Sequence, residues 1–138
     1  MQLINTQIFL YQVLKKKKLL AKQWLLIQFP VNAADKYTNF SLLSLENAKS
    51  TGKTVVINSY EPWCWSCRKQ DKVLLGAKDE FKDVIFLTYQ QGKHKDIAEA
   101  LNVSVRTTIV VFKGKKEVAR IIGQTEKTEI YSAIKKGI

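Results

Sequence analysis

Hydrophobic and polar residues follow two different periods along this chain, and their order predicts strands separated by helices. Residues 54–60 and residues 83–89 are short runs rich in β-branched and aromatic side chains, which indicates two buried strands. Residues 108–113 and 117–122 are two more such runs around Gly114, which predicts a hairpin. The hydrophobic pattern therefore predicts four strands.

Between these runs the apolar residues recur at helical spacing. Helices are predicted at residues 41–49, from the region after Cys67 to about residue 78, at residues 96–101 and at residues 126–136. Ser41 and Thr125 are candidate N-caps, and Gly52 is a candidate end signal. Because helices alternate with strands first and a hairpin comes last, we expect an α/β fold. It should be a single domain with a central mixed β-sheet and helices on both faces.

The first 34 residues have a different pattern. Four lysines at residues 15–18 precede a short apolar stretch that ends in small residues at 31–34. This order is typical of a secretory signal, although Lys22 interrupts the apolar stretch. We therefore expect residues 1–34 to be an N-terminal targeting segment, either a signal peptide or an anchor, and residues 35–138 to be the folded domain. We therefore expect the protein to be exported, periplasmic or otherwise extracytoplasmic. The alternative is a cytoplasmic protein with an N-terminal extension.

The distribution of charge along the chain indicates which classes of partner to expect. The formal net charge is +11, and five of the lysines lie within the first 34 residues. The other basic residues are scattered among acidic ones, with no basic stripe or interleaved aromatic set, so no nucleic-acid partner is expected. A membrane partner is expected only if the N-terminal segment is an uncleaved anchor.

Both cysteines of the chain lie in residues 63–67, which read Trp-Cys-Trp-Ser-Cys and directly follow the predicted strand at 54–60. Pro62 suits a turn into the next helix, which places Cys64 at a helix N-terminus. Unpaired N–H groups and the helix dipole favour a thiolate there. We therefore expect Cys64 to be the attacking thiol and Cys67 the resolving thiol.

Over roughly residues 40–137, the chain resembles the thioredoxin family. The Trp-Cys-x-x-Cys sequence after a buried strand and the late hairpin carry the resemblance. It implies a thioredoxin-like fold and a protein-disulfide oxidoreductase. The redox-active group would be a Cys64–Cys67 disulfide, with no other cofactor. The partners would be proteins with thiols or disulfides and a redox partner protein.

The resemblance also implies a substrate-binding surface beside the cysteines. Trp65 lies between the cysteines, where an exposed aromatic ring suits contact with a partner, and Trp63 flanks them, with core packing as its alternative role. The family's substrate-holding loop corresponds to Arg106 and Thr107.

The sequence departs from the family at three positions. Asn58 stands where the family carries a buried acid, and Thr88 stands where a lysine often partners that acid. Thr107 stands where the family has a cis-proline, so we expect a trans bond or local distortion there, with the Thr107 N–H and hydroxyl close to Cys64.

Two alternative functions stay open at this point. One is a metal or iron–sulfur module in which a dimer shares the two cysteine pairs, because a tetrahedral site takes four ligands. The other is a redox-inactive interaction module.

Overall fold

The computed structural model describes residues 40–138, in which four strands form one mixed sheet. The elements are α2 (Leu42–Ser50), β1 (Thr54–Tyr60), α3 (Trp65–Glu80), β2 (Ile85–Gln90), α4 (Lys95–Ala100), β3 (Thr108–Lys113), β4 (Lys116–Ile122) and α5 (Lys127–Lys135). The strand order is β2-β1-β3-β4. The expected α/β fold with a mixed sheet is confirmed.

Strand β1 is the central element of this sheet. It pairs in parallel with β2 and antiparallel with β3, and β4 extends the sheet antiparallel to β3. All seven residues of β1 are buried, which explains its nearly continuous β-branched sequence. Because β1 and β2 are parallel, their carboxyl ends meet at one edge, and the cysteine motif follows β1 at that edge.

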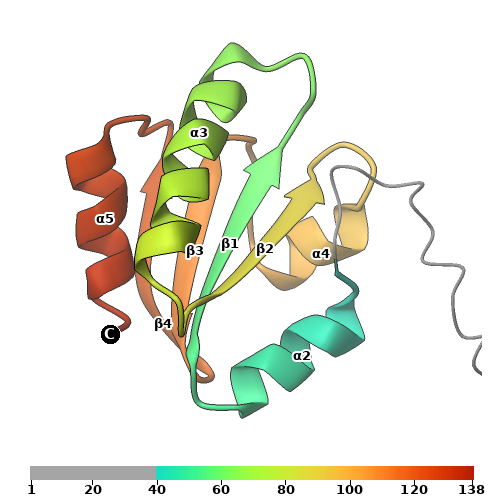
Figure 1. The fold of residues 1–138 in the computed structure, drawn as a ribbon. Coiled ribbons are helices and arrows are strands. Elements are labelled where there is room, and N and C mark those ends of the chain that lie inside the picture. The colour runs from blue at the N-terminus through green and yellow to red at the C-terminus, as the bar shows by residue number, and fades with distance from the viewer. Residues whose placement is uncertain (1–39) are drawn as a thin grey trace, which may run out of the picture. The chain divides into compact units, whose positions relative to one another are not determined.

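Alternate residues of the strands face two separate hydrophobic cores. Val55 and Ile57 pack with residues of α2 and α4, whereas Val56 packs with residues of α3 and α5. Figure 1 shows α3 and α5 on one side of the sheet and α2 and α4 on the other. Helices therefore cover both faces, as expected.

Several predicted boundaries differ from the observed ones by one to three residues. Helix α3 begins at Trp65 with Cys64 as its N-cap, so the helix N-terminus predicted at Cys64 is confirmed, and the helix extends to Glu80 rather than to about residue 78. Helix α5 has its N-cap at Glu126 rather than Thr125, and no side chain caps it. Strand β2 runs Ile85–Gln90, since its pairing with β1 continues as far as Gln90.

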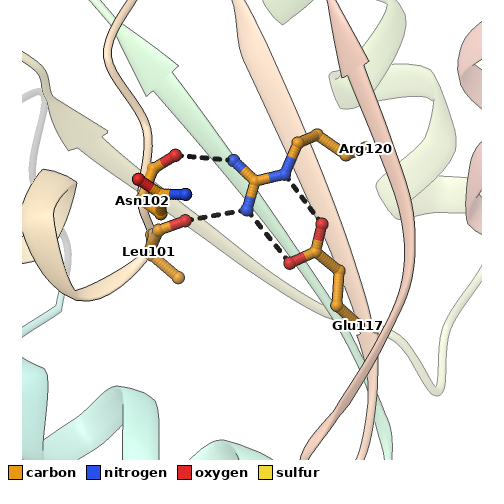
Figure 2. A network of polar contacts seen from close by, with 4 residues as sticks. All are labelled: Leu101, Asn102, Glu117 and Arg120. Atoms are coloured by element: carbon orange, nitrogen blue, oxygen red, sulfur yellow. Dashed lines mark hydrogen bonds and ion pairs between the residues drawn. The ribbon is translucent and has the colours of Figure 1, made fainter.

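A network of polar contacts joins β4 to the end of α4 (Figure 2). The Arg120 guanidinium donates to both carboxylate oxygens of Glu117, at 2.7 and 3.0 Å. It also donates to the carbonyl oxygens of Leu101 and Asn102, at 2.7 and 3.0 Å. One planar side chain therefore satisfies two carbonyls at the C-terminus of a short helix.

Residues 1–39 lie outside the described residues, so the predicted targeting segment and the division at residue 34 remain predictions. In the described part, none of the helices has the length and apolar character needed to cross a membrane.

Candidate active site

The Cys64 side chain is the N-cap of α3. Its Sγ accepts a hydrogen bond from the backbone N–H of Cys67, with 3.2 Å between nitrogen and sulfur. The backbone N–H of Cys64 donates to the carbonyl oxygen of Glu61 at 3.1 Å, which closes the turn that carries the chain from β1 into the helix. The sulfur therefore sits at the positive end of a 16-residue helix, as the sequence predicted.

The surroundings of Cys64 favour its thiolate. Burial acts in the opposite direction, but hydrogen bonds from Cys67, Ser66 and Thr107 outweigh it and lower the pKa of Cys64 to about 6. Its Sγ lies 3.3 Å from the Ser66 hydroxyl and 3.4 Å from the Thr107 hydroxyl. At neutral pH the Cys64 sulfur is mainly ionised, which is the form that attacks a disulfide.

Cys67 has the opposite character. Its side chain is buried in the first turn of α3, and burial together with its hydrogen bond to Cys64 raises its pKa above the ordinary value of 9.0. Both cysteines are free thiols in this structure. One turn of helix thus pairs a reactive thiolate with a protonated neighbour.

Thr107 lies directly against both sulfurs. Its hydroxyl oxygen is 3.4 Å from the Cys64 sulfur and 3.2 Å from the Cys67 sulfur. The bond between Arg106 and Thr107 is trans, as expected, and Thr107 has a φ of 61°, so the expected distortion is present as well. The hydroxyl of Thr107 lies close to Cys64 as expected, whereas its N–H donates to the carbonyl oxygen of Ser59 at 3.1 Å.

The two tryptophans are on the surface beside this site. Trp63 and Trp65 are 64% and 69% exposed, so the alternative of core packing for Trp63 was wrong. The Arg106 guanidinium lies 4.3 Å from the ring centroid of Trp63, and that of Arg68 lies 5.6 Å from the ring centroid of Trp65. Two exposed aromatic rings therefore lie beside the cysteines, and each has an arginine guanidinium within cation–π distance.

Asn58 is buried in β1, on the same face as Val56 and therefore on the side of α3. Its Oδ1 accepts a hydrogen bond of 2.7 Å from the Thr88 hydroxyl, and its Nδ2 has no partner. Neither side chain of this pair takes up a proton at ordinary pH, unlike the acid that the family carries.

Sequence reasoning missed Gln70. This residue is fully buried in α3 and donates through Nε2 to the carbonyl oxygens of Thr107 and Gln124, at 3.3 and 2.9 Å. Gln70 occurs at helical spacing from the buried residues Cys67, Leu74 and Ala77, and this spacing could have predicted a buried polar side chain.

Comparison with known proteins agrees with this geometry. The family model described as Thioredoxin matches residues 36–136. The thioredoxin of Mycoplasma genitalium is 38% identical over 90 residues, which is 65% of this chain and 88% of that protein. Thioredoxin H2 of Arabidopsis thaliana is 31% identical over 94 residues, covering 68% of this chain and 70% of that protein.

Solved structures give the same result. The crystal structure of mitochondrial thioredoxin 3 from Saccharomyces cerevisiae, in its oxidised form, superposes with a TM-score of 0.62 at 26% identity. The match covers 68% of this chain and 88% of the yeast chain. From the fold, the capped cysteine pair and these matches, we conclude that the chain belongs to the thioredoxin family and is a thiol–disulfide oxidoreductase.

Proposed function

We propose that this chain exchanges disulfides with protein substrates, with Cys64 as the attacking nucleophile and Cys67 as the resolving thiol. The main support for this proposal is the difference in pKa and surroundings between the two thiols. The pKa of Cys64 is lowered to about 6 at the helix N-terminus, while burial raises the pKa of Cys67. Only Cys64 is therefore a ready nucleophile at neutral pH.

The reaction follows from these positions. The Cys64 thiolate attacks one sulfur of a substrate disulfide, forms a mixed disulfide and releases the other sulfur as a thiolate. Cys67 then loses its proton and attacks the Cys64 sulfur, which releases the second substrate sulfur and closes the Cys64–Cys67 disulfide. A redox partner protein reopens this disulfide, and the reverse sequence would oxidise a substrate dithiol.

The exposed surface around Cys64 supports a polypeptide substrate. Trp63 and Trp65 offer aromatic contact area on either side of the nucleophile, and Arg106 adds a cation. Thr107 lies beneath this surface, since it is 3% exposed and its N–H and carbonyl are bonded to Ser59 and Gly123.

Two cysteine variants test the roles. Cys64→Ser should abolish reduction of a protein disulfide such as that of insulin. Cys67→Ser should trap substrates as mixed disulfides, because attack still occurs and resolution does not. If alkylation of the reduced protein near neutral pH labels Cys67 before Cys64, the assignment is reversed.

The alternatives gain no support from the site or the relatives. Two cysteines supply half of a tetrahedral ligand set, and no cluster of three or more His, Cys, Asp or Glu that could hold a metal ion occurs among residues 40–138. The intact cysteine pair and the lowered pKa of Cys64 argue against a redox-inactive module.

We also propose that residues 1–34 direct the chain out of the cytoplasm, on the pattern of lysines, apolar stretch and small residues. Cleavage would leave a mature chain that begins at Ala34 or Asp35. Intact mass of the protein from its native host tests this, and a full-length soluble cytosolic form would contradict it.

A further inference from the structure

The resolving step poses a chemical problem in this protein. Cys67 is 1% exposed and its pKa is raised, yet it must lose a proton before it can attack the mixed disulfide. Asn58 is a buried amide on the side of the sheet that α3 covers, and an amide cannot accept this proton. Some other group has to carry the proton away from Cys67.

A chain of two hydroxyls begins at the Cys67 sulfur. The Thr107 oxygen lies 3.2 Å from this sulfur and 2.9 Å from the Ser66 oxygen. Thr107 is 3% exposed, whereas Ser66 is only half-buried, so the chain runs from the interior towards solvent. A hydroxyl has one donor and two acceptor positions. Once Cys64 is part of the mixed disulfide, it is no longer a thiolate that needs the Thr107 proton, so Thr107 can accept from Cys67 while it donates to Ser66.

The backbone holds the Thr107 hydroxyl at this point. Thr107 has a φ of 61°, a left-handed conformation that is unfavourable for a β-branched residue. Its carbonyl oxygen accepts from the Gly123 N–H at 2.8 Å and from Gln70 Nε2 at 3.3 Å, and its N–H donates to Ser59. Three hydrogen bonds therefore keep a strained residue between the two sulfurs.

We propose that Thr107 and Ser66 form a hydroxyl relay that removes the proton of Cys67 during resolution. This inference rests on the proposed roles of Cys64 and Cys67. Thr107 accepts the Cys67 proton while passing its own to Ser66, and Ser66 passes its proton to water. The Cys67 sulfur supplies the electron pair of the new bond to the Cys64 sulfur, and the substrate sulfur departs as a thiolate with the pair of the broken bond.

The experiment separates attack from resolution. The full-length reduced protein is mixed with one equivalent of an aromatic disulfide, dithiobis(nitrobenzoate), and the release of the coloured thiolate is followed by stopped flow. The first equivalent reports attack by Cys64, and the second reports resolution by Cys67. At about pH 8 Cys64 is ionised, since its pKa is about 6, so loss of one hydrogen bond has little effect on the first phase.

The informative variant is Thr107→Val, which keeps the branched shape and removes the hydroxyl. It should slow the second phase by roughly 10-fold to 100-fold, the lower part of the range for positioned acid–base groups. It should slow the first phase much less, because Cys64 keeps its contacts with the Cys67 N–H and the Ser66 hydroxyl. The second phase should also require a higher pH. Thr107→Ser should restore the rate of the second phase, and Ser66→Ala should slow the second phase as well.

Thr108→Val is the matched control. The Thr108 hydroxyl donates to the carbonyl oxygen of Val105 at 2.8 Å and is not part of the relay, so this variant should keep both phases. A folded Thr107→Val variant with an unchanged second phase would overturn the relay while leaving the proposed function intact. If the Thr107 variant does not fold, an unchanged second phase in Ser66→Ala has the same meaning. Release of only one equivalent by the unmodified protein would instead contradict the proposed role of Cys67.

Discussion

The hydroxyl of Thr88 donates a hydrogen bond of 2.7 Å to Oδ1 of Asn58, across the parallel pair of β1 and β2 in which the two residues are partners. Asn58 is 3% exposed, and its Nδ2 has no hydrogen-bond partner. A buried, unpaired N–H₂ group lowers stability, and an oxygen at the same place would remove that unpaired donor. This half-satisfied amide under the active-site helix leads to the first prediction.

The substitution Asn58→Asp should make stability depend on pH. Burial disfavours the charged carboxylate, so the pKa of the new side chain in the folded protein should lie above the unfolded value of about 3.9. The stability of the variant relative to the parent should therefore be greatest below about pH 4 and fall as pH rises through the folded pKa. Urea unfolding at a series of pH values measures this. Asn58→Leu, which cannot titrate, should differ from the parent by the same amount at every pH, and an equally constant difference for Asn58→Asp would contradict the prediction.

The reduction potential should change its pH dependence near pH 6. Below the Cys64 pKa of about 6, closing the disulfide releases two protons, and above it only one, because Cys64 is already a thiolate and Cys67 is not. The potential should fall by about 59 mV per pH unit below the break and by about 30 mV per unit above it. Equilibration with a dithiol buffer at each pH measures the slope. A single slope of about 59 mV per unit from pH 5 to pH 8 would mean that Cys64 is not ionised in this range, and would contradict the prediction.

Truncating either exposed tryptophan should impair protein substrates and spare small ones. Trp63→Ala and Trp65→Ala should each lower kcat/KM for a protein disulfide by roughly 5-fold to 30-fold, as expected for an aromatic contact residue. The rate with a small aromatic disulfide should change little, since it does not span the surface. Leu43→Ala is the control, because Leu43 is 72% exposed on α2, which packs on the other face of the sheet. If kcat/KM falls equally for both substrate types, the tryptophans act on the reaction itself or on folding rather than on substrate contact.

Gly137→Ala should destabilise the domain although it lies outside the regular elements. A Cβ at this position would stand 2.5 Å from Thr54 Cγ2 and 3.2 Å from Val111 Cγ1, closer than side chains tolerate. We expect a loss of roughly 1–3 kcal/mol in the free energy of unfolding, measured with urea. Thr54→Ser removes Cγ2 and keeps the hydroxyl that donates to the Gly137 carbonyl oxygen. In the Thr54→Ser background the Gly137→Ala substitution should therefore cost less, and an equal cost would place the strain elsewhere.

Local sequence was sufficient for much of this protein. The β-branched run of β1 predicted its bounds, Thr54–Tyr60, because a strand buried on both faces needs apolar residues at nearly every position. The hairpin of β3 and β4 and the placement of Cys64 at a helix N-terminus also follow from short-range signals: a glycine turn, a proline and the motif itself. These features depend on neighbours within a few residues, so they can be predicted from the local sequence.

Tertiary structure decided what surrounds the two sulfurs. Thr107 is 40 residues from Cys67 in sequence, and only the fold brings its hydroxyl within 3.2 Å of that sulfur. Its left-handed backbone, its bonds to Ser59, Gly123 and Gln70, and the exposure of Trp63 are set by packing between distant segments. The motif therefore placed the two proposed reacting sulfurs one helical turn apart, while long-range contacts set the pKa values that separate the two thiols, because hydrogen bonding and burial are properties of the assembled site.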